Sequence, residues 1–357
     1  MRWQRLQLRG ISLVETLVGL AVFFIISVSV YQAYSTVLKV FSAARVKILA
    51  TYLVNEQLEI MRNLPYPNIG TVGGIPYGVV PPTQTITRDG LNFTIVTAIR
   101  NIDDPFDGIL GGTPADTAPA DYKLIELTIN CLNCGDPGSF RFTGRASPKN
   151  LETASSNGAL FIQVIDANGE AVSGATVQVT NTTVTPNVNI TDTADAAGFL
   201  KIIDAPPASE SYRIIVFKTG YSQDRTYAID QQTPTPVKPD ATVALGQVTQ
   251  ITFAIDKVSQ LEVSSVTETC AAVGNVNFRL TGAKIINIDP QTFKYEASQI
   301  TDGPGLLTVS NLEWDNYTLG FDSSLNSYDL SGVIPPSPFN LIPNTSQNLK
   351  LVMKPEN

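Results

Sequence analysis

The segment from Ile11 to Val30 constrains this chain most strongly, because its twenty residues contain a single charged side chain. At 1.5 Å of rise per residue, a helix of this length spans about 30 Å, which is the hydrocarbon thickness of a bilayer. The residues before Gly10 include three arginines and no acid. Because positive charge stays on the cytoplasmic side, the pattern predicts a single-pass membrane protein with its N-terminus in the cytoplasm and its C-terminus outside.

Glu15 is the one charged residue of this segment. A carboxylate at the centre of a spanning helix costs roughly 2.5–3.5 kcal/mol, and the cost is smaller near the helix end. A simple anchor has little reason to keep such a residue. The sequence therefore indicates that Glu15 meets a partner of opposite charge.

Gly10 followed by Ile-Ser-Leu-Val-Glu resembles the class III signal of type IV prepilins and pseudopilins, and the likeness covers about residues 5 to 65. It implies that residues 1–10 are a leader, that a prepilin peptidase cleaves after Gly10, and that the new amine of Ile11 is methylated. The family more often has Phe at this first mature position. The resemblance also implies that Glu15 pairs with that amine on a neighbouring subunit and sets filament register. The implied partners are the peptidase, other pilin or pseudopilin subunits, the inner filament machinery and the membrane.

Two other interpretations of the N-terminus stay open. A secretory signal peptide has an apolar core of 7–15 residues and a small-x-small cleavage site. Ser27-Val28-Ser29 offers a weak site of that kind, although the apolar segment is longer and contains Glu15. A plain membrane anchor requires neither Gly10 nor Glu15.

The helix is expected to continue beyond the membrane, because no proline or glycine occurs from Tyr31 to Leu64, and Pro65 and Pro67 follow. The sequence predicts one helix over Ile11–Leu64, roughly 80 Å long, within a module at 11–65 that is transmembrane first and amphipathic afterwards. The apolar stripe expected to pack on a small sheet comprises Tyr34, Val37, Leu38, Phe41, Ile48, Tyr52 and Leu53.

Residues 66–148 are rich in turns and short alternating segments. Gln84–Arg88 and Phe93–Arg100 flank Asp89-Gly90, which predicts a β-hairpin with a type I′ turn. Tyr122–Cys131 predicts a third strand. The region resembles the small head of a minor pilin or pseudopilin, which implies an α+β module with an antiparallel sheet lying on the helix.

Cys131 and Cys134 lie at the end of the third predicted strand. Outside the membrane, such a pair most simply forms a structural disulfide. Free thiols remain an alternative, as does a metal or redox site, although neither a second CxxC nor a thioredoxin-like βαβ pattern is present. We expect Cys270 to be a lone buried thiol.

A polar linker at 149–158 precedes a segment, 159–257, in which strand patterns alternate with Gly and Asp turns. This spacing is typical of a β-sandwich. The succession of Asp166–Gly169, Thr191–Phe199 and Tyr212–Tyr221 resembles carboxypeptidase regulatory-like domains. That resemblance implies a prealbumin-like, Ig-like fold and carries no peptidase activity.

Residues 258–357 predict a second, degenerate β-sandwich of the same kind. The turn at Asp302 matches the turn at Asp195, and Tyr317 matches Tyr212, with offsets of 107 and 105 residues. Two matches at nearly one offset indicate an internal repeat, so the expected fold is an α+β pilin-like module followed by two all-β sandwiches.

Composition narrows the functional classes. The chain has no histidine, which removes the usual neutral-pH general base, the Ser-His-Asp triad and His-ligated metals. A net charge of −8 disfavours nucleic acid as a partner. Asp103, Asp104 and Asp107 lack EF-hand spacing and predict a solvated loop rather than a calcium site. We therefore expect no enzymatic activity, no cofactor and no metal.

The sequence predicts a minor pilin or pseudopilin of a type IV filament system, with its sandwiches displayed at the cell surface. The head of about 290 residues suits a low-copy or tip subunit. The alternative is a membrane-anchored surface adhesin or binding module with no filament role. In either case Tyr221, Trp314 or Tyr317, if exposed, would face a carbohydrate or protein ligand, although buried sandwich aromatics are more common.

Overall fold

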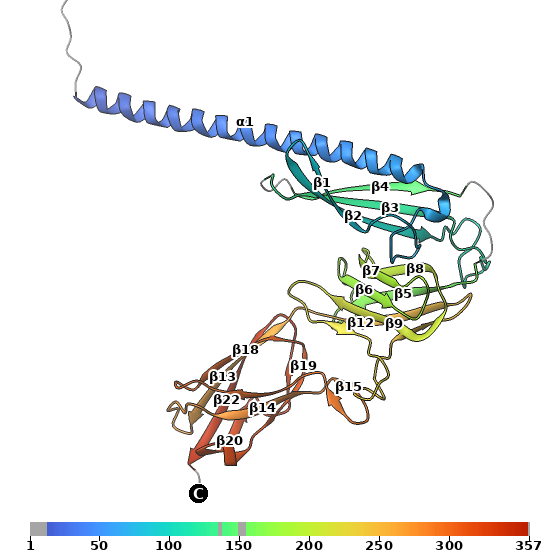
Figure 1. The fold of residues 1–357 in the computed structure, drawn as a ribbon. Helices are drawn as coiled ribbons and strands as arrows, with labels where there is room; N and C mark the ends of the chain where they lie inside the picture. The colour runs from blue at the N-terminus through green and yellow to red at the C-terminus, as the bar shows by residue number, and fades with distance from the viewer. Residues whose placement is uncertain (1–12, 135–137, 149–154, 356–357) are drawn as a thin grey trace, which may run out of the picture. The chain divides into compact units, whose positions relative to one another are not determined.

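The computed structural model describes residues 13–134, 138–148 and 155–355. It shows one long helix followed by β-strands in several sheets (Figure 1). The chain divides into two compact units: the first contains the helix with residues 83–97 and 126–143, and the second contains residues 64–82, 98–125 and the chain from 144 onward.

Helix α1, Leu13–Arg62, is a single element of 50 residues. It confirms the predicted continuous helix over the part of the chain that the structure describes. The helix ends before Pro65, whose missing N–H cannot continue the hydrogen-bond ladder. The short 3-10 helix η1, Tyr66–Asn68, follows.

The predicted apolar stripe of α1 is wrong in most of its members. Of the predicted residues, only Leu53 is buried; the other six are at least half exposed. The buried side chains of the helix are Val46, Ala50, Leu53, Val54 and Met61. They all lie in the last third of α1. Apolar side chains occur on several faces of the helix, so periodicity alone could not select the buried face.

A four-stranded sheet of order β1-β2-β3-β4 accompanies the helix. Its strands are β1 (Thr83–Arg88), β2 (Leu91–Ile102), β3 (Tyr122–Cys131) and β4 (Phe140–Ala146). The predicted hairpin is confirmed: β1 and β2 pair antiparallel, and Asp89 and Gly90 both have positive φ, 49° and 75°, as a type I′ turn requires. The predicted third strand is confirmed as β3, and β4 was not predicted.

The first β-sandwich belongs to the second unit. Its strands are β5 (Gly158–Ile165), β6 (Thr176–Asn181), β7 (Val188–Thr193), β8 (Phe199–Ala205), β9 (Ala208–Phe217), β10 (Asp224–Arg225), β11 (Ala241–Val243) and β12 (Val248–Ala254). One sheet has the order β10-β9-β6-β7 with β11 also on β9, and the other has the order β12-β5-β8. Alternate side chains of both sheets, including Ile162, Val177 and Phe253, share one apolar core.

The second β-sandwich follows directly. Its strands are β13 (Ser259–Thr267), β14 (Asn277–Gly282), β15 (Ile285–Asn287), β16 (Thr292–Phe293), β17 (Glu296–Ile300), β18 (Leu306–Leu312), β19 (Asp315–Gly320), β20 (Tyr328–Ile334), β21 (Phe339–Leu341) and β22 (Ser346–Pro355), with the 3-10 helix η2 (Ser323–Leu325) before β20. Sheets of order β18-β13-β22-β20 and β17-β14-β19-β21 share a second core, and β15 pairs with β16 alone.

The two sandwiches repeat one strand arrangement. β5 pairs antiparallel with β8 and parallel with β12, just as β13 pairs antiparallel with β18 and parallel with β22. Asp195 and Asp302 each accept, through Oδ1, the backbone N–H of the residue four positions later. Tyr212 and Tyr317 are buried, and each donates its hydroxyl to a backbone carbonyl, at 2.6 and 2.8 Å. The residues matched in the sequence thus occupy equivalent places.

Two loops of the second unit, Gly70–Gly78 and Gly108–Asp116, are built alike, and we call them the twin loops. Both read Gly-x-x-Gly-Gly-x-Pro, with matched residues 38 positions apart, and each contains a cis X–Pro bond. In each, the carbonyl of the second residue, Thr71 or Ile109, accepts the N–H groups of the fifth and ninth residues at 2.9–3.2 Å.

The twin loops pack against the first sandwich and form a hydrogen bond to it. Ile75, from the first loop, joins the main core of that sandwich. Leu110, from the second, packs with Ala159 and Ile203. The carbonyl of Gly73 also accepts the N–H of Asn189 on β7 at 2.6 Å.

Candidate functional site

The predicted N-terminal site is only partly within the described residues: Gly10 and Ile11 lie outside them. Glu15 lies in the first turn of α1 as described. Glu15 is exposed there, two residues after the first residue that the structure describes.

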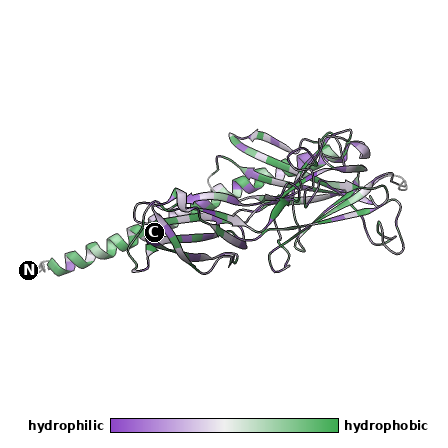
Figure 2. Ribbon diagram, turned by 90° about the horizontal axis from the view of Figure 1, so that it is seen from below, coloured by the Kyte–Doolittle hydropathy of each residue, from purple (hydrophilic) through white to green (hydrophobic). Residues whose placement is uncertain are grey.

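The N-terminal half of α1 presents its apolar side chains outward. No side chain from Leu13 to Arg45 is buried, and Figure 2 shows the end of the helix near the N label as mostly green. The large apolar residues before Tyr31 that are 49–80% exposed are Leu13, Val14, Leu17, Val18, Leu20, Val22, Phe23, Phe24, Ile25, Ile26, Val28 and Val30. The segment is long and apolar enough to cross a membrane. So large an apolar surface requires lipid or protein to cover it.

The C-terminal part of α1 is held against the β1–β2 hairpin by polar contacts as well as by its buried residues. Arg88 forms an ion pair with Glu56, and the Gln84 side chain donates to the Gln57 side chain at 2.8 Å. The Arg45 guanidinium donates to the carbonyl of Asp89 at 3.3 Å. These contacts fix which part of the helix lies on the sheet and leave the N-terminal half uncovered.

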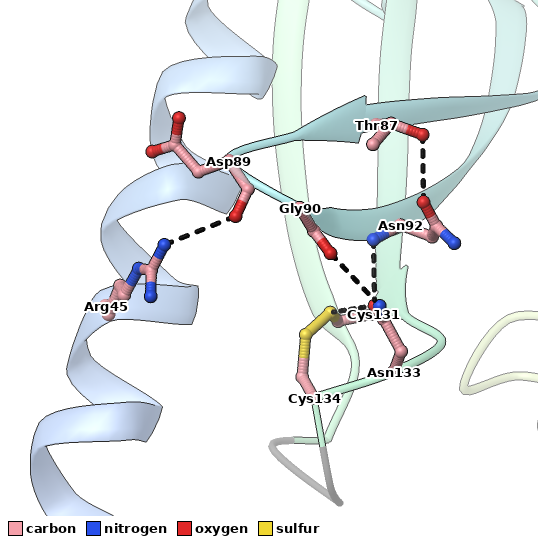
Figure 3. Close-up of a disulfide and its surroundings, with 8 residues drawn as sticks. All are labelled: Arg45, Thr87, Asp89, Gly90, Asn92, Cys131, Asn133 and Cys134. Atoms are coloured by element: carbon pink, nitrogen blue, oxygen red, sulfur yellow. Dashed lines mark hydrogen bonds between the residues drawn. A yellow bond between two sulfur atoms is a disulfide. The ribbon is translucent and has the colours of Figure 1, made fainter.

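Cys131 and Cys134 form a disulfide at the end of β3 (Figure 3). Between them, Asn133 donates through its amide to the carbonyl of Gly90 at 3.2 Å and accepts the N–H of Asn92 at 2.8 Å. The loop closed by the disulfide is therefore bonded to the β1–β2 turn, which is the turn that Arg45 of α1 contacts (Figure 3).

Cys270 is exposed, so the expectation of a buried thiol is wrong. The cause is local. Cys270 lies in a tight turn just after β13, with a φ of 64°, and its N–H bonds to the carbonyl of Thr267 at 2.9 Å. The turn follows the end of β13, an inner strand of its sheet, and it leaves the Cys270 side chain exposed to solvent.

The acidic loop around Asp103 uses its carboxylates to hold its own backbone. Asp103 accepts the N–H of Leu110 at 2.9 Å, and Asp104 accepts that of Phe106 at 3.3 Å. Burial raises the pKa of Asp103, and the carboxylates of Asp116, Asp121 and Asp107 raise this pKa further, against the hydrogen bond from Leu110. Among the described residues, no group of three or more His, Cys, Asp or Glu side chains is arranged to hold a metal ion.

Lys123 was not among the predicted site residues, yet its side chain is only 5% exposed. Its ammonium donates to the carbonyls of Tyr66 and Ile69 at 2.8 and 2.6 Å and lies 4.5 Å from the centre of the Tyr66 ring. Burial lowers the pKa of Lys123 to about 8, although the Asp204 carboxylate acts in the opposite direction. The alternation of apolar and polar residues in β3 predicts a strand, but it does not indicate that the side chain of Lys123 is buried.

The aromatic residues considered as ligand contacts differ in position. Tyr317 is 1% exposed and belongs to the second core, so it faces no ligand. Tyr221 is half-buried and packs against the first core. Trp314 is half-buried and lines a cavity with residues of both sandwiches.

The structure defines a chain with one long apolar N-terminal helix followed by all-β sandwich domains. No family model and no curated protein matches it. Similar solved structures include the TIE protein of Bacillus anthracis (13% identity, 77% of this chain and 56% of that chain, TM-score 0.23). They also include the minor pilin of Streptococcus agalactiae (13% identity, 56% and 97%, TM-score 0.27) and a streptococcal ancillary pilin (13% identity, 65% and 76%, TM-score 0.25).

Several of these structural neighbours are thus pilin subunits of Gram-positive bacteria. The chain spans about half the length of the Bacillus anthracis protein. At these TM-scores and identities the likeness carries no argument about what this chain does or binds.

Proposed function

We propose that this chain is a minor pilin or pseudopilin of a type IV filament system, cleaved after Gly10 and methylated at Ile11. The observation that carries the proposal is the division of α1: its N-terminal half exposes apolar side chains on all sides, while its last third is packed on a sheet. Such a helix can lie in a bilayer before assembly and against other helices after it.

The proposed assembly has a simple energetic basis. Helices that stack in a filament remove apolar surface from contact with water at roughly 25 cal/mol per Å². Glu15 of one subunit would meet the Ile11 amine of its neighbour, so two charges that are costly in an apolar core would neutralise each other. Register would then follow from this pair, because a shifted helix leaves both charges buried without their partner.

The experiment uses the protein from its native cells. Mass spectrometry of the N-terminus should find a chain that begins at Ile11 with a methylated amine. Glu15→Ala should still be cleaved but be lost from sheared filaments, whereas Ser29→Ala, another polar position on the same helix, should be retained. A chain that begins at Met1 or near Tyr31, or filaments that incorporate Glu15→Ala normally, would refute the proposal.

A membrane-anchored surface binding protein without a filament role is the second candidate. It is favoured by the size of the chain beyond the helix, most of which is β-sandwich. We propose that these sandwiches are of the carboxypeptidase regulatory-like, prealbumin-like kind and have no catalytic role. If the sandwiches are the binding part, removal of residues 159–357 should abolish surface attachment. If the full-length chain is also absent from sheared filaments, the anchored protein is favoured; normal attachment by the truncated chain would refute a binding role for the sandwiches.

A further inference from the structure

A cavity of about 410 Å³ lies between the first and second sandwiches, and we call it the inter-sandwich cleft. The two sandwiches are joined beside it by main-chain bonds from Val237 to the carbonyl of Ile286 and from Ile288 to the carbonyl of Thr235, both at 3.0 Å. Asn287, which is fully buried, accepts the N–H of Thr235 at 2.9 Å. The cleft is therefore bounded by connected backbone, and its volume falls within the range of small-molecule sites.

Positive charge gathers in this cleft although the whole chain carries a net charge of −8. Its charged lining consists of four cations and two carboxylates: Arg225, Lys238, Lys284, Lys294, Asp224 and Glu313. Glu313 is shared, since Lys284 lies 2.7 Å and Lys294 2.6 Å from its two oxygens. Lys238 pairs with Asp224, and the Asp315 carboxylate beside the cleft accepts the backbone N–H of Lys284. The four cations still outnumber the carboxylates, which leaves the cleft with a surplus of positive charge.

Aromatic rings flank cations of the cleft, in which Lys238, Lys284 and Lys294 are half-buried and Arg225 is exposed. The Lys284 ammonium is 3.3 Å from the ring centre of Trp314, and the Arg225 guanidinium is 4.7 Å from that of Tyr227. Burial lowers the pKa of Lys284; the Glu313 carboxylate opposes that shift, Lys294 adds to it, and Asp315 also opposes it. A desolvated cation gains more from an incoming anion than a hydrated one does, because the local dielectric is lower.

We propose that the inter-sandwich cleft binds a carboxylated sugar unit of an acidic polysaccharide, whether or not the chain enters a filament. The surplus cations would receive the carboxylate. The apolar walls, which include Val237, Ile285 and Ile286, would contact the C–H face of the ring. The negative charge of the chain disfavours a dense polyanion such as nucleic acid. A flexible acidic peptide would lose about 1–2 kcal/mol of backbone entropy per residue ordered, whereas a sugar ring is already rigid.

The test is calorimetric titration of the full chain in detergent with trigalacturonic acid. We expect a dissociation constant of about 0.1–1 mM at low salt, weakening as salt rises. Lys284→Gln should weaken binding about tenfold, and Glu313→Gln should tighten it several-fold by removing the competing carboxylate. Lys350→Gln, an exposed lysine on β22 outside the cleft, is the matched control and should leave binding unchanged.

Opposite effects from the two members of one ion pair could not arise from misfolding, which would weaken binding in both variants. Neutral galactotriose should not bind. Equal binding of trigalacturonic acid and a triglutamate peptide would overturn the saccharide, and absence of binding at 10-fold above the expected constant would overturn the site. Equal affinities of the wild type, Lys284→Gln and Glu313→Gln would place any binding elsewhere and refute the inference.

Discussion

Lys123→Met tests the electrostatic cost of the buried amine beneath the Tyr66–Ile69 turn. The pKa of Lys123 falls from an ordinary value of 10.5 to about 8. At about 1.4 kcal/mol per pKa unit, the ammonium form costs the folded state roughly 3 kcal/mol relative to the neutral amine. The folded state binds fewer protons than the unfolded state between pH 8 and 10.5, so this cost is fully present below pH 8 and is relieved as the pH rises through that interval.

The methionine side chain is similar in volume to that of lysine and does not titrate. The free energy of unfolding of the wild type should therefore rise by about 3 kcal/mol relative to that of Lys123→Met between pH 7 and 10.5. Other groups that titrate in this interval are common to both proteins. Because a multidomain chain does not unfold in one two-state step, the readout should be local: pulse proteolysis in urea, with peptides from residues 64–82 quantified by mass spectrometry. A difference between the two proteins that does not change with pH would refute the reasoning.

Two further predictions concern the cores. Burial raises the pKa of Tyr212 to about 12, so the stability that comes from keeping its hydroxyl neutral should be present below pH 10 and be lost between pH 10 and 12. Tyr212→Phe and Tyr317→Phe should each destabilise their sandwich by about 1 kcal/mol at pH 7, measured by calorimetry. Unchanged melting would contradict the role of the hydroxyl hydrogen bonds. Leu53→Ala should destabilise the helix–sheet unit by about 2–5 kcal/mol, while Tyr52→Ala, at a position 70% exposed, should have little effect; equal effects in proteolysis assays of the helix would mean that the buried face is wrongly assigned.

Local signals in the sequence predicted local structure well. Asp89-Gly90 between alternating segments specified the type I′ hairpin, because two consecutive positive φ angles suit few other residue pairs. The absence of proline and glycine from Tyr31 to Leu64, followed by Pro65, specified where α1 ends. The turn at Asp195 and its match at Asp302 revealed equivalent strands, since an aspartate that accepts a nearby N–H fixes the turn before the strand.

Features that depend on distant contacts were not predictable in the same way. The buried face of α1 is chosen by the sheet, and its members Val46 and Ala50 are no more apolar than the exposed Ile48. The Lys123 ammonium can be buried because it donates hydrogen bonds to two backbone carbonyls of residues more than fifty positions earlier in the chain. The twin loops did carry a signal, the duplicated Gly-x-x-Gly-Gly-x-Pro, which a search for short repeats at an offset of 38 would have found.

The construction of the twin loops has a consequence for how such a chain can change. Glycine, proline and main-chain bonds make each loop, so the side chains at positions 75 and 110 are not needed to form it. Both side chains pack against buried apolar residues of the first sandwich. A different domain could therefore be accommodated beside the twin loops by exchanging apolar side chains on them while the loop frames stay intact. The twin loops would then serve as a constant connection to which different domains can be attached, by evolution or by protein engineering.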